Sequence, residues 1–491
     1  MGFSHIDYAI IIVYVLGVTL AGSLIAGRQK NARDYFLGGK SLSWWAVGFS
    51  IVASETSTLT FISVPGLAFR SDMHFLQLVF GYFIGRVLVA WLFIPAYYRG
   101  DLETAYDFLG RRFGLSVRRL ASVTFIVTRV LASGVRLFAT AIPVHLVTGL
   151  GYAQSIALIG ACTIIYTYAG GLKAVVAMDV VQLCVYLCGA AASMALILHV
   201  LPGGWADVTA FATRGGTDKF EILNPSWGGS LAGFLASPYT LAGSLLGGTF
   251  LTMASHGTDQ LLVQRLLGCR SARESRNALL LDAAFIVVQF AFFLLLGLAL
   301  FAYYGGVTYG ALGLGSSDEV FPSFIVHRLP AGLAGLLVAA ILASAMGTLS
   351  SSISSLASST YLDLYRLARR SQAADPGGEV RTSRLLTLVW GAVLVGGAML
   401  FTDTANPVVE LGLRIASFTY GGLLGTFFLG LFFRGTRSRD ATAGLIAGLA
   451  AMTAVIFCTT IDYTWHTLIG CVATLVVGNL SSLLFPYGNK S

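Results

Sequence analysis

Polar side chains interrupt stretches of sequence that are otherwise strongly apolar, and these residues are the ones able to do chemistry. Between Gly48 and Gly66 the run contains Glu55 and a series of serines and threonines, and it closes with a Pro-Gly pair. Serine and threonine hydroxyls compete for backbone hydrogen bonds, so a helix is expected to break here. Unwound backbone inside a membrane is tolerated only where it lines a cavity. The segment therefore predicts a polar site.

A second run of hydroxyl side chains extends from Ser344 to Ser355. In a helix, Thr348, Ser351, Ser352 and Ser355 would repeat at i, i+3, i+4 and i+7 and line one face. Small residues of this kind also serve close helix packing in membranes, which is the structural alternative. Hydroxyl and carbonyl oxygens are the hard, uncharged ligands that a small cation such as sodium accepts. The stripe thus favours a cation site.

Ionisable residues also fall inside apolar segments. Asp179 lies within the run that follows Lys173, and it could either pair with that lysine or serve as the charge partner of a monovalent cation. The second interpretation is favoured because a buried carboxylate near a hydroxyl stripe suits a cation. Glu410 and Arg414 lie at i,i+4, a spacing more typical of an internal salt bridge than of a binding site.

Three arginines also lie in apolar runs: Arg86, and Arg129 and Arg136, which are two helical turns apart. Arginine stays charged and costs at least a few kcal/mol at the centre of a bilayer, so each should face a partner or water. Glu55 is one candidate partner, and a carboxylate of the substrate is another.

The composition requires a membrane. Of 491 residues, 56% are hydrophobic and 11% are charged, whereas soluble domains carry about a quarter charged residues. Apolar windows such as 8–26 and 286–304 match the length that crosses about 30 Å of hydrocarbon, and only helices satisfy their own backbone there without closing a barrel. The first window is too long for a signal-peptide core and is expected to be retained. We predict an all-α membrane protein with roughly 13 transmembrane helices.

Basic residues predict the orientation of these helices. They concentrate in the loops after the odd-numbered spans, for example at Arg111 and Arg366, and the intervening loops carry only Arg70, Arg214, Lys219 and Arg328. The positive-inside rule then places the amino end outside and the carboxyl end in the cytoplasm of a cell membrane. The net charge of +8 follows from this topology and indicates no nucleic-acid partner. The six cysteines fall mostly within spans, so neither a disulfide nor a metal site is predicted.

Glycines predict a second interrupted span. Gly243, Gly247 and Gly248 lie in the segment 235–263, five crossings after the first break. Because five is odd, two five-helix units of this kind must be inverted relative to each other, which indicates a transporter with its site between discontinuous helices. We expect one transmembrane domain over 1–491, with an extra helix at 8–27, a first repeat at 42–200, a second, inverted repeat at 235–435 and two final helices at 440–487.

Several motifs also resemble those of a known family. They are Tyr35 to Trp45 (YFLGGKSLSWW), Gly170 to Val175 with Asp179 and Gln182, Thr258-Asp-Gln with Gln264-Arg265, and the serine-rich span ending at Asp363-Leu-Tyr365. From about residue 8 to 440 the chain resembles the sodium/solute symporters, which include sodium/glucose, proline, iodide, pantothenate and sialic acid transporters. The resemblance implies the amino-acid/sodium symporter-like fold, with broken helices at mid-depth in an inverted repeat.

The resemblance also implies two sodium sites. At the first, the carbonyls of Ala53, Thr56 and Ser344 and the hydroxyl of Thr348 match the ligands. The chain departs from the family at Gly347, where relatives usually carry another hydroxyl. The sialic acid branch has a second sodium site, whose ligands match Asp179, Ser350 and Ser351.

Substrate positions on the broken helix correspond to Glu55, Ser57 and Thr60. The arginine that binds a carboxylate in the sialic acid branch corresponds to Ala132, so specificity for sialic acid does not follow. Arg129, one turn from Ala132, and Arg136 are the remaining candidates for binding substrate.

These features together predict a secondary active symporter that imports a small polar organic solute with sodium by alternating access. The solute could be a sugar, a carboxylate or an amino-acid-like molecule. A proton-coupled symporter that uses Asp179 or Glu55 is the alternative, and a membrane solute sensor is a weaker one because no long soluble segment is present. No arrangement typical of an enzyme falls within one site, and no obligatory protein partner is indicated.

Overall fold

The computed structural model describes residues 4–25, 29–56, 58–216, 218–368, 376–400 and 408–484. Within these ranges the elements are helical, and an isolated bridge between Leu42 and Cys269 is the sole β-type pairing. The first half of the chain forms α1 (His5–Ile25), α2 (Ala32–Leu37), η1 (Gly38–Lys40), α3 (Trp44–Glu55), α4 (Thr58–Arg70), α5 (Phe75–Tyr98), α6 (Ala105–Phe113), α7 (Leu115–Thr148), α8 (Tyr152–Val200), α9 (Trp205–Ala212) and η2 (Arg214–Gly216).

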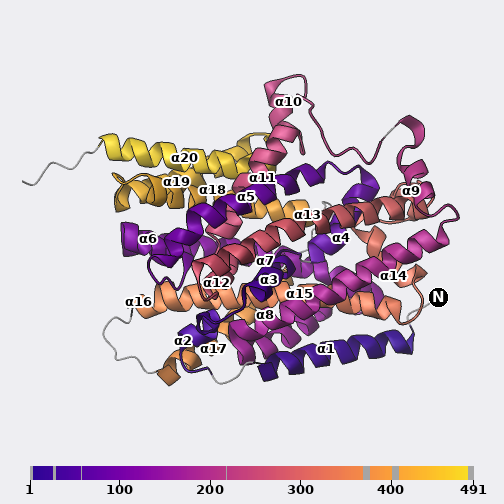
Figure 1. Ribbon diagram of the computed structural model, residues 1–491, viewed down its shortest axis with the longest axis horizontal. Coiled ribbons are helices and arrows are strands. Elements are labelled where there is room, and N and C mark those ends of the chain that lie inside the picture. The colour runs from indigo at the N-terminus through magenta and orange to yellow at the C-terminus, as the bar shows by residue number, and fades with distance from the viewer. Residues whose placement is uncertain are drawn as a thin grey trace, which may run out of the picture.

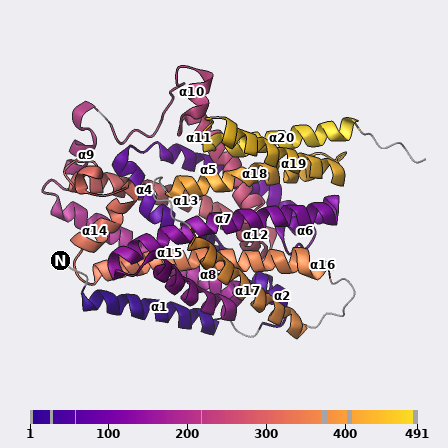
Figure 2. The same cartoon turned by 180° about the vertical axis from the view of Figure 1, so that it is seen from behind.

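The second half continues the bundle. It forms α10 (Leu231–Ala236), α11 (Leu241–Gly257), α12 (Gln260–Leu267), α13 (Ala272–Tyr303), η3 (Gly310–Leu312), η4 (Ser317–Glu319), α14 (Val320–Arg328), α15 (Leu333–Ser359), η5 (Thr360–Tyr365), α16 (Arg366–Ala368), α17 (Pro376–Ala398), α18 (Val408–Phe432), α19 (Ser438–Cys458) and α20 (Tyr463–Leu484). α1 lies at one edge, α19 and α20 lie at the opposite edge, and α3, α7, α12 and α15 occupy the middle (Figures 1 and 2).

Nine helices of the described part are long and apolar enough to cross a membrane, and the bent pair α3 and α4 makes a tenth candidate. α8 spans 49 residues and turns sharply at Gly171, whose φ is 57°. A Cβ at Gly171 would lie 2.6 Å from the Tyr35 carbonyl, so both the dihedral and the close approach require glycine. The prediction of an all-helical membrane protein is confirmed. The count of about 13 crossings and the boundaries of the repeats remain predictions.

The predicted break in the second span is present. α3 ends at Glu55, α4 begins at Thr58, and the two axes differ by 56°. Thr56 leaves the helical region at φ −75° and ψ 68°, and its backbone N–H and hydroxyl both donate to the Val52 carbonyl at 2.8 Å. The hydroxyl therefore helps to end the helix, as expected for threonine. Pro65 and Gly66 lie within α4 and do not form the break.

The second break lies inside the predicted segment 235–263, but not at the three glycines. α11 runs without interruption through Gly243, Gly247 and Gly248, and the chain breaks later, at Thr258 before α12. These glycines serve packing: a Cβ on Gly248 would collide with the Leu78 carbonyl and approach Gly81 on α5. Small residues that bring two helices together and glycines that interrupt a helix give the same sequence pattern.

The two ends of the bundle differ in character. α2, α6 and α16 lie at one end, and the first residues of the chain, α9 and α14 lie at the other (Figures 1 and 2). The first of these ends carries the predicted cytoplasmic arginines, including Arg111 and Arg366. Segments predicted to share a side of the membrane therefore lie together.

Candidate substrate and sodium sites

A cavity of about 100 Å³ lies beside the break between α3 and α4. We call it the central cavity. Its polar wall comes from the α3 break, α5, α7, α11 and α18, and its apolar wall comes mainly from α5, α12 and α13. It is lined by Ser54, Glu55, Thr60, Phe75, Tyr82, Arg86, Arg129, Arg136, Leu251, Thr252, Ser255, Leu261, Leu262, Ile286, Phe290, Gly412, Leu413, Ala416 and Tyr420.

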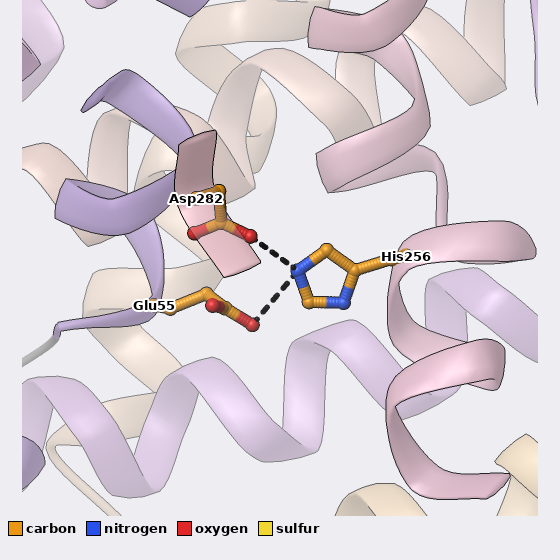
Figure 3. Close-up of side chains that lie close together, drawn as sticks. All are labelled: Glu55, His256 and Asp282. Carbon is orange, nitrogen blue, oxygen red and sulfur yellow. Dashed lines mark ion pairs between the residues drawn. The ribbon is translucent and has the colours of Figure 1, made fainter. Parts of the chain in front are cut away.

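Glu55 belongs to a cluster of four residues that we call the Glu55 cluster: Glu55, Arg86, His256 and Asp282. The Arg86 guanidinium donates to Glu55 Oε2 and, at 2.6 Å, to Asp282 Oδ2. His256 Nε2 lies 3.1 Å from Glu55 Oε1 and 3.5 Å from Asp282 Oδ2, and both carboxylates face it in Figure 3. Of the three arginines considered as partners of Glu55, the structure pairs Arg86 with it, and Arg129 and Arg136 form no ion pair with it.

Arg129 pairs instead with Asp259, which follows the break at Thr258 and is the N-cap residue of α12. Tyr420 on α18 donates to the same Asp259 oxygen at 2.6 Å and accepts from Arg129 at 3.3 Å. Asp259 Oδ1 caps α12 by accepting from the Leu261 N–H. Arg129 lines the cavity, but its charge is compensated by this network.

Arg136 has no such partner. Among the described residues it forms no ion pair, and its Nε atom is buried without a hydrogen-bond partner. It lines the central cavity and also a second pocket of about 10 Å³, which Thr348 and Ser352 of α15 line from the other side. Arg136 thus stands between the cavity and the hydroxyl stripe.

The residues predicted for the first sodium site come together where the α3 break meets α15. The Ser344 hydroxyl donates to the Thr56 carbonyl at 2.7 Å, and the Thr348 hydroxyl donates to the Ser344 carbonyl at 3.0 Å. Ala53 is buried in the last turn of α3. Gln289 of α13 donates to the Thr56 hydroxyl at 2.5 Å. This arrangement gathers carbonyl and hydroxyl oxygens from two elements.

Gly347 lies beside unsatisfied oxygens. A Cβ there would collide with Gln182 Oε1 and lie 3.1 Å from Asp179 Oδ1. Both oxygens are buried without a hydrogen-bond partner among the described residues. The Gln182 amide therefore occupies space that a side chain at position 347 would otherwise fill.

The residues predicted for the second sodium site also lie close together. Asp179 pairs through Oδ2 with Arg265 at 3.0 Å, not with Lys173, and accepts from Ser50 at 2.5 Å. The Ser350 and Ser351 hydroxyls donate to the Gly347 carbonyl at 2.9 and 2.6 Å. Asp179 Oδ1 is buried without a hydrogen-bond partner among the described residues. Because a buried carboxylate oxygen needs a partner, this atom fits a cation site.

The remaining predicted residues are placed as follows. Thr60 is buried, lines the central cavity and donates to the Glu55 carbonyl at 3.3 Å. Ser57 and the side chain of Glu410 lie outside the described residues. Arg414 lies 3.8 Å from Asp462. All six cysteines are unpaired thiols.

Three ionisable residues that complete these networks were missed as site residues: Arg265, His256 and Asp282. Asp282 is an acid inside the apolar run of α13 and is fully buried, so the rule applied to Asp179 could have found it. Arg265 and His256 lie next to the second break, which was placed too early in the chain. Correct placement of that break would have drawn attention to both.

Broken helices around a polar cavity, inside an all-helical bundle of membrane-spanning length, define a membrane transporter. The family model of the sodium:solute symporter family matches residues 35–448. The sodium/sialic acid symporter NanT of Aliivibrio fischeri is 27% identical over 490 residues, which cover 98% of this chain and 94% of NanT. The human sodium/iodide cotransporter is 31% identical over 449 residues, 90% of this chain and 68% of that protein.

Solved structures agree with these matches. A Na⁺-coupled sialic acid symporter in its substrate-bound outward-open state superimposes with a TM-score of 0.87 at 27% identity, and the match covers 100% of both chains. The inward-facing conformation of Mhp1 matches with a TM-score of 0.54 at 13% identity over 90% of this chain and 92% of Mhp1, which supports the fold alone. The chain belongs to the sodium:solute symporter family. It is therefore an integral membrane transporter that couples a solute to sodium, and it is not an enzyme.

Proposed function

We propose that this protein imports a small polar organic solute with an anionic group, together with sodium, by alternating access. The observation that carries the proposal is the position of Arg136. Its unpaired guanidinium lines the central cavity and also contacts the pocket that reaches Thr348 of the first sodium site. A substrate anion on Arg136 would thus lie next to the coupling ion.

The first sodium site would use the carbonyls of Ala53, Thr56 and Ser344 and the hydroxyl of Thr348. Sodium would displace the hydrogen bonds that now join Ser344 to Thr56 and Thr348 to Ser344. Because those bonds link α15 to the end of α3, the ion would replace a direct contact between two elements by a shared ligand set. Occupancy of the site would therefore bias how the broken helix sits on α15.

The second site would use Asp179 Oδ1 with Ser350 and Ser351. Arg265 compensates the other carboxylate oxygen of Asp179, and Oδ1 remains without a partner. Gln182 Oε1, which like Asp179 Oδ1 borders the space left by Gly347, is a second unsatisfied oxygen that could join it. A sodium ion here would satisfy two buried oxygens that the protein alone leaves unpaired.

One sodium ion suffices to concentrate a solute without net charge, whereas a solute with one net negative charge needs both sodium ions to gain from the membrane potential. Inward movement of one sodium ion contributes about 2.3 kcal/mol per 100 mV of membrane potential before any concentration gradient is added. On the substrate side, Glu55, Thr60 and Arg136 contact the central cavity. Arg129 lines the same cavity, and we assign it to holding α7 against α12 through Asp259.

The orientation that we propose places the end with α2, α6 and α16 in the cytoplasm and the first residues of the chain outside. Thr213 follows α9 at the opposite end and Arg273 begins α13, and both are exposed. In a background without native cysteines, Thr213→Cys should react with an impermeant thiol reagent applied to intact cells, and Arg273→Cys should react only after lysis. The reverse pattern would refute this orientation.

The function is tested by uptake into liposomes that contain the purified protein. A panel of radiolabelled sugars, carboxylates and amino acids is offered under an inward sodium gradient and, separately, under an inward proton gradient without sodium. We expect uptake with the sodium gradient alone, for solutes with an anionic group. Uptake that ignores sodium and follows the proton gradient, and that is lost in Asp179→Asn, would replace sodium coupling by proton coupling.

A further inference from the structure

The charges around the central cavity are separated into a negative and a positive part. Glu55 and Asp282 share one arginine, Arg86, so these three side chains together carry one net negative charge. Arg129 and Asp259 compensate each other. Arg136, on α7, carries one net positive charge that no described residue compensates. The lining of the cavity therefore carries one negative charge at the Glu55 cluster and one positive charge at Arg136.

The imidazole of His256 is neutral, so it does not cancel the negative charge of the Glu55 cluster. Its Nε2 faces oxygens of both carboxylates, so this nitrogen must carry a hydrogen. Its Nδ1 lies 2.9 Å from the Ser255 hydroxyl, which is closer than the 3.2 Å from that hydroxyl to the Thr252 carbonyl. The hydroxyl can therefore donate to Nδ1, which leaves the imidazole neutral and the net negative charge in place.

A metal ion is a poor occupant of this cluster. Glu55, His256 and Asp282 offer ligand atoms within 4.8 Å of one another (Figure 3). However, His256 Nε2 carries the hydrogen that faces both carboxylates and so offers no lone pair to an ion, and both carboxylates already accept from Arg86. The cluster can still compensate a single positive charge that approaches from the cavity.

Glu55 is the group through which the cluster reaches the cavity. Its side chain is 21% exposed, whereas Arg86, His256 and Asp282 are at most 1% exposed. Since Arg86 and His256 each contact one of its oxygens, the carboxylate is held in place with lone pairs left for one more donor. It is a preformed acceptor for a cationic donor.

Resting on the function proposed above, we propose that the substrate is a zwitterion, a small amino acid or a close analogue, whose ammonium group binds Glu55 and whose carboxylate binds Arg136. Such a molecule compensates both charges at once. A simple carboxylate or a sugar leaves the negative charge at Glu55 unpaired in a low-dielectric site, which is unfavourable. The cavity of about 100 Å³ is well above the roughly 10–15 Å³ that a single water needs, so it has room for a small organic molecule.

Binding of matched ligands to the purified full-length protein in saturating sodium tests this proposal. The probes are the twenty standard amino acids, and for each of several, such as alanine and proline, the molecules that lack one charge: lactate and propionate, or cyclopentanecarboxylate and pyrrolidine. We expect at least one amino acid to bind about tenfold or more tightly than any of its single-charge analogues, as one lost charge-assisted hydrogen bond implies.

The variant Glu55→Gln sharpens the test. It should remove the preference for the amino acid over its carboxylate analogue, because the remaining Arg86 and Asp282 pair is neutral and leaves no net negative charge to bind an ammonium group. Glu55→Asp, which keeps the charge, should retain part of the preference. If no amino acid binds, or if an analogue binds as tightly as its amino acid, the proposal is wrong.

Failure of this proposal can be distinguished from failure of the proposed function. Sodium alone should raise the melting temperature of the protein whatever the solute is. If sodium stabilises the protein and a simple carboxylate binds as tightly as any amino acid, the zwitterion is refuted and sodium symport of an anionic solute stands. If sodium has no effect on melting or on the binding of any solute, the proposed function itself is refuted.

Discussion

Arg129 and Arg136 lie on the same helix, α7, and both line the central cavity, yet their surroundings differ. Arg129 is 5% exposed and is held by Asp259 and Tyr420. Arg136 is partly exposed, forms no ion pair among the described residues and has a buried Nε without a partner. A compensated arginine stabilises the fold, whereas an uncompensated one beside a cavity is available to a ligand. The two roles cannot be told apart from residue type and spacing.

The largest effect is expected for Arg129, the arginine that stabilises the fold. Arg129→Gln leaves Asp259 buried without its cation, which typically costs about 3–5 kcal/mol. We expect the free energy of unfolding to fall by about this amount, measured by denaturant titration of the purified protein in detergent. Stability within about 0.5 kcal/mol of the unmodified protein would show that Asp259 does not depend on Arg129.

Arg136→Gln should have the opposite signature. Removal of an uncompensated charge from a low-dielectric site should not lower stability. Loss of a charge-assisted hydrogen bond worth about 1.5–3 kcal/mol should weaken binding of the anionic solute by about tenfold to hundredfold.

Both quantities are measured on the same preparation, by thermal melting with and without solute. Arg119→Gln, at an exposed position of the same helix, is the matched control and should change neither. Unchanged solute affinity in Arg136→Gln would remove Arg136 from the substrate site.

The smallest effect in this comparison is expected at Tyr420. Tyr420→Phe removes one hydrogen bond to Asp259 and keeps the ring that lines the cavity. We expect a loss of about 0.5–1.5 kcal/mol in the free energy of unfolding and little change in solute affinity. If the free energy of solute binding falls by more than the free energy of unfolding does, Tyr420 binds the solute directly. The network around Arg129 is then part of the substrate site.

The fold was largely predictable because hydropathy and charge report directly on membrane crossing. The break after Glu55 was also predictable, since a dense series of hydroxyl side chains weakens a helix locally. The exact position of the second break was not, because Gly247 packs against Thr464 of α20, Gly248 packs against α5, and both leave α11 intact. A glycine pattern records close approach of backbone, and the neighbouring helix that requires it is not visible in the sequence.

The site was predictable in its members but not in its pairings. Glu55, Thr348, Asp179 and Arg136 were all recognised as polar residues at membrane depth. Their partners come from distant segments: Arg86 and His256 for Glu55, and Arg265 for Asp179. Which acid meets which arginine depends on helix packing, so the roles of the arginines could be assigned only from the structure.

If sodium binds where the α3 break meets α15, as we propose, the sodium concentration that half-saturates uptake should depend on Thr348. Thr348→Ala removes a hydroxyl that donates to the carbonyl one turn earlier, and Thr453→Ala removes a hydroxyl in the same local arrangement on the exposed side of α19. Measured in liposomes, the half-saturating sodium concentration should rise by about tenfold or more in Thr348→Ala, as loss of a ligand worth at least 1.4 kcal/mol implies. It should stay unchanged in Thr453→Ala. Equal half-saturating sodium concentrations in both variants and in the unmodified protein would show that Thr348 is not a sodium ligand.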